Sequence, residues 1–201
     1  IYDEAGKTTT LRMKQMTDTS AGTPIYALPP KVAMIMPRAG SSRSPVIATT
    51  VQIDKLEQDL KLPGTVKPDS VRIDPEHDLL MDTQTTGPSD AELPAQLRYA
   101  PSYQERLRAA RRLATGDKIK DDGTVRMLTE ALSAESSDIA AAGILSLLAD
   151  SGKATLRPVF REQAASKSPG RRAAALGALG ALPADPTDLA LVRKVALSDT
   201  E

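Results

Sequence analysis

The sequence predicts a multidomain protein in which an all-β sandwich is followed by an all-α solenoid of α-hairpins. Residues 8–81 contain short β-branched segments separated by prolines and glycines, which is typical of strands joined by turns. The later residues are rich in alanine and leucine with a helical period. Triplets that begin at Arg108, Ala140 and Arg172 recur after roughly 32 residues, which lies in the range of helical-pair repeats.

The first domain is expected to cover residues 1–83 as a sandwich of about six or seven strands. The predicted strands are 8–16, 25–28, 32–36, 46–53, 54–62 and 66–73. The segment 54–62 is ambiguous, because Leu56 and Leu60 lie four apart as on a helix. The alternation of Leu56, Leu60 and Leu62 with polar residues, and the closing Pro63, favour a strand. Residues 37–45 are expected to form a loop between strands.

A linker with a connecting helix is expected at 84–100, and the solenoid at 101–201 as three α-hairpins. Ser102 and Glu105 fit a capping box, and Ser137 is a second predicted N-cap. Ser168 precedes a proline, which favours an N-cap followed by the first helical residue. Small residues, among them Gly177 and Gly180, are expected to let neighbouring helix axes approach closely.

Composition argues against several classes of function. The formal net charge is zero, so a nucleic-acid-binding role loses weight because such proteins usually carry a basic excess. Aromatic residues make up 2% of the chain, which disfavours a small-molecule pocket. There is no cysteine, which excludes disulfides and thiolate zinc sites. A membrane-spanning helix needs about 18 apolar residues, and no apolar run of the sequence approaches that length, so no membrane partner is expected. The chain reads as a piece of a longer polypeptide.

The order of strands and helices resembles the C-terminal region of the zinc aminopeptidases typified by aminopeptidase N. The residues that carry this resemblance are Leu11 and Gln15, Leu60, the run from Val71 to Pro75 with Leu79 and Leu80, and the run 93–114 with Gln96, Leu97 and Arg106. The resemblance implies an immunoglobulin-like β-sandwich followed by a HEAT-like helical domain. It also implies that the parent protein removes N-terminal amino acids by hydrolysis and holds zinc in a separate catalytic domain.

The chemistry of that family is not carried by this chain. Its zinc site needs the motif H-E-x-x-H, in which two histidines on one helix face bind the metal and a glutamate activates water. His77 is the single histidine of the sequence, so no catalytic, cofactor-binding or metal-binding residue is assigned. His77 in Asp74-Pro75-Glu76-His77-Asp78 is read as part of a solvated turn, with a metal ligand as the minor alternative.

Two groups of arginines are the candidate site residues, as a possible interface. Arg106, Arg108, Arg111 and Arg112 form a basic helix surface, and Arg171 and Arg172 begin another helix. A solvated charged face is the simplest interpretation of the first group; the alternative is contact with an absent catalytic domain or a peptide carboxylate. Cations at a helix N-terminus oppose the helix dipole, so a contact with a neighbouring element is expected for the second group.

We therefore expect a non-catalytic C-terminal fragment that braces the catalytic domain of a zinc aminopeptidase and limits peptide access to its active site. Its partners would be that catalytic domain and, through it, peptide substrates. The isolated chain is not expected to be an enzyme. The alternative is a HEAT-repeat adaptor that binds a protein partner through the helices.

Overall fold

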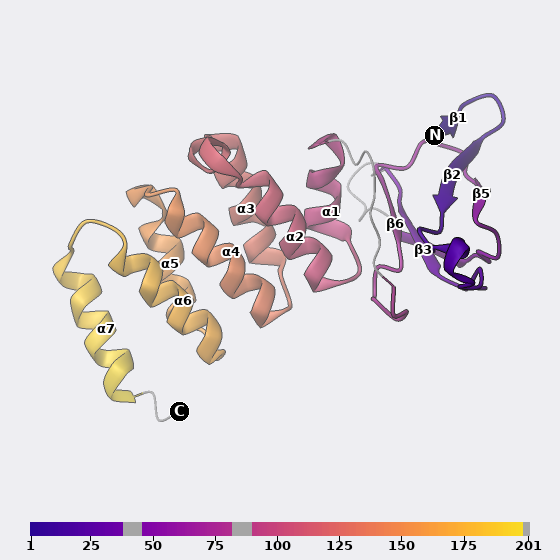
Figure 1. Cartoon of the computed structure of the whole chain (residues 1–201). Helices are drawn as coiled ribbons and strands as arrows, with labels where there is room; N and C mark the ends of the chain where they lie inside the picture. Colours follow the sequence, from indigo (N-terminus) through magenta and orange to yellow (C-terminus); the bar gives the residue numbers. More distant parts are fainter. Residues whose placement is uncertain (38–45, 82–89, 199–201) are drawn as a thin grey trace. The chain divides into compact units, whose positions relative to one another are not determined.

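The computed structural model describes residues 1–37, 46–81 and 90–198, which divide into two compact units, Ile1–Ser102 and Tyr103–Glu201 (Figure 1). The predicted loop at 37–45 and the predicted boundary at 83–84 lie, except for Pro37, outside the described residues. The elements of the first unit are β1 (Tyr2–Asp3), β2 (Thr8–Lys14), η1 (Thr19–Ala21), β3 (Lys31–Ile35), β4 (Val46–Thr50), β5 (Glu57–Pro63), β6 (Ser70–Ile73), η2 (Asp90–Glu92) and α1 (Leu93–Tyr99).

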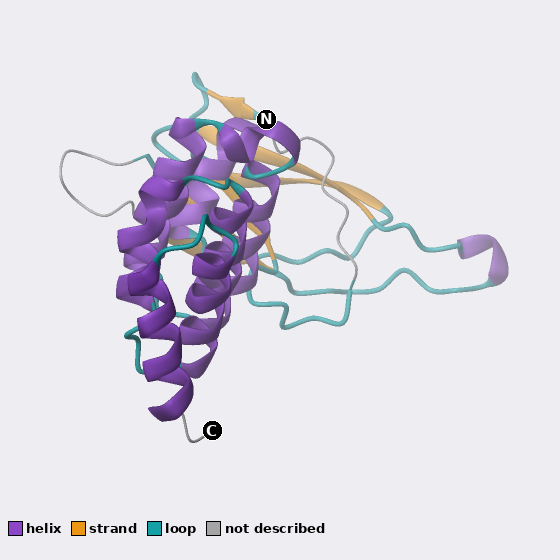
Figure 2. Ribbon diagram, turned by 90° about the vertical axis from the view of Figure 1, so that its left-hand side faces the viewer, coloured by secondary structure: helices purple, strands orange, loops and turns teal. Residues whose placement is uncertain are grey.

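The strands of the first unit form two separate antiparallel sheets of three strands, in the orders β1-β2-β5 and β4-β3-β6. In the first sheet Leu11 lies opposite Leu60. In the second, Met34 of the central strand lies opposite Ile47 on one side and Val71 on the other. Figure 2 shows the strands with a short helix, η1, at the end of a loop that extends from them.

The central strand β3 is buried on both of its faces, which explains its continuous apolar sequence. Val32 and Met34 belong to a hydrophobic cluster that also contains Leu62 of the first sheet. Side chains alternate along a strand, so Ala33 and Ile35 point to the opposite face. Helix α1 contacts β3, and its residues Leu93 and Leu97 are buried. A strand covered on both faces loses the apolar–polar alternation that half-buried strands show.

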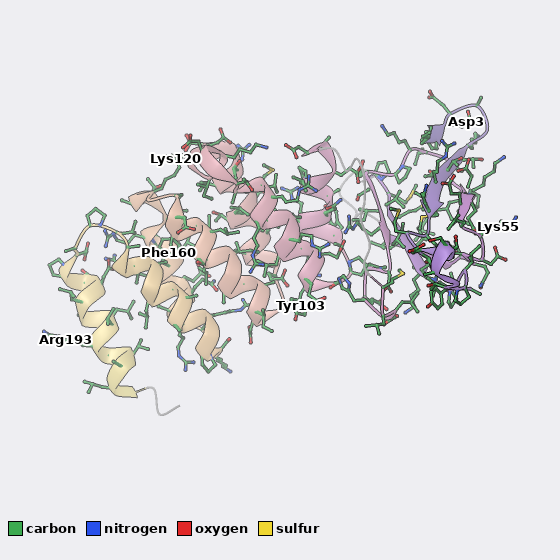
Figure 3. The ribbon with its side chains drawn as sticks, viewed as in Figure 1. Asp3, Lys55, Tyr103, Lys120, Phe160 and Arg193 are labelled. Carbon is green, nitrogen blue, oxygen red and sulfur yellow. The ribbon has the colours of Figure 1, made fainter. Side chains whose placement is uncertain are left out.

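The second unit is helical. Its elements are α2 (Tyr103–Leu113), η3 (Gly116–Lys120), α3 (Asp122–Ala134), α4 (Asp138–Asp150), η4 (Ala154–Leu156), α5 (Arg157–Gln163), α6 (Pro169–Gly180) and α7 (Pro186–Ser198). Helix α4 packs between α2 and α6, α3 contacts α4, and α5 contacts α6. Phe160 of α5 is fully buried (Figure 3), as are Leu128, Ile144 and Leu148. The buried faces of α3, α4 and α5 therefore contribute to the core of this unit.

A glycine marks the closest approach of two of these helices, but it is not one of those predicted. A Cβ added to Gly143 of α4 would lie 2.6 Å from Leu107 Cδ1 of α2. A Cβ added to Gly177 or Gly180 would meet nothing within 4 Å. The expectation that Gly177 and Gly180 permit close helix packing is thus wrong. Helical periodicity alone does not say which face of α6 meets a neighbour.

The predicted fold class, an immunoglobulin-like all-β sandwich followed by a HEAT-like solenoid, is wrong. Two small three-stranded sheets replace the sandwich, and the unit that contains them also contains the helix α1 on β3. The helices do not form the predicted hairpins: among the described residues, α2 with α3, α4 with α5, and α6 with α7 are not among the main packing pairs. Sequence periods identify strands and helices, whereas their pairing depends on contacts between distant residues.

Several local predictions are confirmed. Ser137 and Ser168 are N-caps whose hydroxyls accept from the N–H of Ala140 and Arg171. Gly152, with φ of +65°, follows the end of α4. Asp121 is a further N-cap: its side chain accepts from the N–H of Thr124 at the start of α3.

Candidate functional site

Arg106, the first candidate arginine, is part of a buried ion pair within the helical unit. Its Nε and Nη2 each donate to a different carboxylate oxygen of Glu135, both at 2.8 Å. The Glu135 side chain is 2% exposed and that of Arg106 16%. Glu135 directly follows the last residue of α3, whereas Arg106 lies on α2. A bidentate pair of this kind fixes both the distance and the orientation of the two elements.

Arg171, at the start of α6, binds the same segment from the other side. Its Nε donates to Asp138 Oδ1 at 2.7 Å, and its Nη2 donates to the Glu135 carbonyl oxygen at 2.7 Å. We call Arg106, Glu135, Asp138 and Arg171 the junction cluster, because it joins α2 and α6 to the turn between α3 and α4. Asp138 lies in the first turn of α4, where a carboxylate is favoured by the helix dipole. The expected contact of Arg171 with a neighbouring element is present.

The junction cluster holds Glu135 in its charged form. Burial alone would raise the pKa of Glu135, but the hydrogen bonds from Arg106 and from the Ser137 N–H outweigh burial and leave the pKa below its ordinary value. The Ser137 N–H donates to Glu135 Oε1 at 2.8 Å. A carboxylate that is stabilised as an anion accepts hydrogen bonds and does not supply a proton. The cluster is therefore suited to holding helices together and not to acid–base chemistry.

A second group of ion pairs joins α5 to the start of α7. Arg161 Nε donates to Asp188 Oδ1 at 2.7 Å, and Arg157 forms a further ion pair with Asp188. Arg157 also donates to the Pro183 carbonyl oxygen at 2.8 Å. Asp188 is buried, with a side chain 8% exposed. In both groups a buried carboxylate at the beginning or end of one helix is bound by arginine from another helix.

The other four candidate arginines differ in their environment. Arg172 donates from Nη1 to the carbonyl oxygens of Ser166 (3.1 Å) and Lys167 (2.9 Å), so it binds the loop after α5. Arg112 is half-buried and also has an interaction partner. Arg108 and Arg111 are exposed on α2. The nearest carboxylate to Arg108 that forms an ion pair is Glu105 at 3.9 Å, which is a weak contact.

Arg108 and Arg111 belong to one solvent-facing stripe of α2. Gln104, Arg108 and Arg111 are all exposed and are spaced by four and three residues. That spacing places them on one side of a helix. The opposite side carries the buried Leu107, Ala110 and Leu113. Of the six predicted interface residues, Arg108 and Arg111 are thus the two that offer an exposed charge on a firmly packed helix.

The acidic turn with His77 is held by hydrogen bonds and a lysine. Asp74 is buried, and its carboxylate oxygens accept from the N–H groups of Asp78 (3.0 Å) and Leu79 (3.1 Å). Lys31 Nζ donates to Glu76 (2.6 Å) and Asp78 (2.8 Å). The hydrogen bonds and charge of Lys31 lower the pKa of Asp78. Glu76 and Asp78 therefore bind Lys31, Asp74 binds backbone N–H groups, and His77 lies in the turn with φ of +57°.

A buried polar network fixes α1 in the first unit. Gln96 Nε2 donates to Ser70 Oγ at 2.9 Å, and Ser70 Oγ donates to Glu92 Oε2 at 2.9 Å. Ser70 and Gln96 are 2% and 4% exposed. A serine, an amide and a carboxylate without a basic partner do not constitute a nucleophile–base pair. The network attaches α1 to β6 and explains why Gln96 is buried.

The described part of the chain does not bring together the ligands of a zinc site. Within residues 1–37, 46–81 and 90–198 no group of three or more His, Asp or Glu side chains could hold a metal ion. In the same residues no helix has the length and apolarity that a membrane-spanning helix needs. Glu135, Asp138 and Asp188 were not predicted from the sequence. Their position at the start or end of a helix was a sequence signal for a role in capping or in ion pairs. The sequence did not identify their arginine partners, because these lie about thirty residues away, as for Arg106 and Glu135 at a separation of 29.

Comparison with known proteins gives similarity to solved structures only. No protein-family model and no curated protein matches the sequence. A crystal structure of Legionella pneumophila aminopeptidase A in complex with aspartic acid is similar over 100% of this chain, with a TM-score of 0.48 and 12% sequence identity. The chain spans 23% of the length of that protein. At these values the similarity assigns neither a family nor an activity to the chain.

Proposed function

We propose that this chain is a non-catalytic part of a larger zinc aminopeptidase, in which it braces the catalytic domain and limits the access of peptides to the active site. The resemblance of the sequence supports the class of the parent enzyme, and a similar solved structure bears the name aminopeptidase A. In this proposal the zinc lies in the catalytic domain of the parent, as the resemblance implies, because the sequence has a single histidine and so lacks H-E-x-x-H.

One observation supports the bracing role. The exposed arginine stripe lies on α2, whose opposite side is buried and whose Arg106 belongs to the junction cluster. Arg106, on the same helix, is held by Glu135 through a bidentate ion pair. Arg108 and Arg111 therefore project from a rigid support, and a rigid positive surface loses little conformational entropy when it binds a partner. An acidic surface of the catalytic domain is the partner that this stripe fits.

The experiment starts from the source gene and then uses the complete gene product. We expect H-E-x-x-H, followed by a further glutamate, in the reading frame before this chain. The double variant R108E/R111E is compared with R193E, which changes an arginine exposed on α7 (Figure 3). We expect R108E/R111E to lower the Tm of the catalytic domain by about 3 °C, because an interface contact is lost. R193E should leave that Tm unchanged.

The access role has its own readout. In R108E/R111E, hydrolysis of an aminoacyl-p-nitroanilide should keep its kcat/KM, whereas discrimination between an unfolded and a folded peptide amino terminus should fall by about tenfold. If the gene lacks the zinc motif, the chain belongs to another class, with a protein-binding adaptor as the next candidate. An unchanged Tm together with unchanged discrimination would refute the role of the stripe.

A further inference from the structure

The outer edge of β4 has no partner strand among the described residues. β4 lies at the end of the sheet order β4-β3-β6. All five of its residues are exposed, with Val46 at 39% and Ile47 at 46%. Its neighbour β3 is covered on both faces, but these covering layers do not bury β4. An apolar strand that is bare on both faces and along one edge is an unusual feature of a folded unit.

The other sheet edges of the first unit are protected. β1 is two residues long. β5 carries the charged residues Glu57, Asp59 and Lys61 and ends at Pro63. β6 is four residues long and contains Arg72. Charges, prolines and short strands are the usual devices against pairing with another chain. β4, with the sequence Val-Ile-Ala-Thr-Thr, has none of them.

The register shows which backbone groups of β4 point outward. The Val51 N–H donates to the Pro30 carbonyl oxygen at 3.0 Å, and Leu28 and Ile53 exchange hydrogen bonds at 2.8 Å. Backbone groups alternate along an antiparallel strand, so Thr49 and Ile47 also direct their N–H and C=O groups toward β3. The N–H and C=O groups of Val46, Ala48 and Thr50 therefore point away from β3, and they are arranged symmetrically about Ala48.

We propose that β4 pairs antiparallel with β4 of a second copy of this chain, with Ala48 opposite the partner's Ala48 on a two-fold axis. In this register Val46 faces the partner's Thr50, and every outward N–H and C=O group of β4 gains a hydrogen bond. Ile47 lies over the partner's Thr49 on one face of the joined sheet. Such cross-strand pairs of β-branched side chains are favourable.

The symmetry of the edge favours a second copy over an unrelated strand. A two-fold interface uses the same surface on both subunits, so the surface must be complementary to itself. Two like charges placed opposite each other would oppose such pairing, and β4 contains no charge. The β4-β3-β6 sheet of one copy and the same sheet of the second copy then become one continuous sheet. Neither copy of β4 is an edge strand in it.

Sedimentation velocity of the full chain between about 1 µM and about 1 mM tests the pairing. We expect a reversible monomer–dimer equilibrium. A48P removes the central outward N–H but none of the hydrogen bonds to β3, because proline is tolerated where the N–H of an edge strand faces solvent. I47K places a charge at the interface. Both variants should raise the dissociation constant by at least about tenfold.

The matched control is V66K, which replaces an apolar residue that is 48% exposed and lies outside the strands. It should dimerise as the parent chain does. Circular dichroism establishes that each variant is folded; if A48P does not fold, I47K decides, since Ile47 is already exposed to solvent.

Amide hydrogen exchange gives a second readout at single residues. With rising concentration the Ala48 and Thr50 amides should become protected, while those of Ile47 and Thr49 are protected throughout. A chain that stays monomeric, a dimer that is unaffected by folded A48P or I47K, or open-ended aggregates would each overturn the proposal.

Discussion

At the scale of single residues, buried carboxylates determine how the helical unit is held. The Glu135 carboxylate accepts hydrogen bonds from Nε and Nη2 of Arg106 and from the Ser137 N–H, and its side chain is 2% exposed. Lys153 and Asp122 also form an ion pair, but Asp122 is 93% exposed. Water competes with the second pair and hardly with the first, so the two differ in what they contribute to stability.

The substitution E135A should destabilise the helical unit by about 1–3 kcal/mol, because Arg106 then loses its partner and the freed N–H of Ser137 loses an acceptor. D122A, the matched control, should change the free energy of unfolding by less than about 0.5 kcal/mol. Urea unfolding followed by circular dichroism of the helices measures both. Equal effects of the two substitutions would contradict the structural role of the junction cluster.

Glu135 also predicts a dependence of stability on pH. Its pKa is lower in the folded state, so between the folded and unfolded values the unfolded chain binds more protons, and stability rises with pH. The contribution is present above about pH 4.3 and is lost as the pH falls through the folded pKa. Titration of the unfolding free energy should show a smaller acid loss in E135Q than in the parent chain. An identical pH profile would show that Glu135 is not stabilised as an anion.

At the scale of elements, helix packing decides what a glycine does. Gly143 lies against Leu107, whereas Gly177 faces open space. Glycine in a helix interior costs about 0.5–1 kcal/mol relative to alanine. Neither glycine has a positive φ, so each can accept a Cβ as far as its own backbone is concerned.

G177A should therefore raise the unfolding free energy of the helical unit by about 0.5–1 kcal/mol. G143A should be less stable than G177A by about 1–2 kcal/mol, because the new methyl group displaces the buried Leu107. A double-mutant cycle with L107A should recover most of this difference. Equal stabilisation by both alanines would show that α2 and α4 are not in close contact at Gly143.

At the scale of the whole molecule, the two compact units have separate cores. The first contains the cluster of Val32, Met34 and Leu62 and the network of Ser70 with Gln96. The second contains Phe160 and the buried leucines of its helices. Units with their own cores are expected to respond separately to core substitutions.

S70A should lower the protection of amides in residues 1–102 against hydrogen exchange by a factor of about ten. The substitution removes the buried hydroxyl that accepts from Gln96 and donates to Glu92. Protection of the α4 amides should not change. E135A should instead lower the protection of the α4 amides and leave that of residues 1–102 unchanged. A uniform loss of protection across residues 1–37, 46–81 and 90–198 in either variant would show one cooperative unit.

The local elements could largely be predicted from the sequence. β-branched or apolar segments mark β2, β3 and β4, and leucines that alternate with polar residues mark β5. Caps at Ser137 and Ser168 mark the start of α4 and α6. These signals are local, because they depend on the backbone preferences of a few adjacent residues. The arginine candidates were correct as positions of charge, but not as one surface: Arg106, Arg171 and Arg172 bind within the fold, and Arg108 and Arg111 face solvent.

By itself, then, the sequence determined that the chain has a single histidine and indicated roughly where most helices and strands lie. Its bounds were less accurate, because the predicted strand 25–28 is absent and the predicted strand 66–73 covers only Ser70–Ile73. Only the tertiary structure decided that the strands form two separate sheets, that α4 packs between α2 and α6, and which carboxylate each arginine binds. The physical reason is range. Backbone preferences act between neighbours in the chain, whereas pairing and burial join residues such as Arg106 and Glu135, whose proximity no local pattern records.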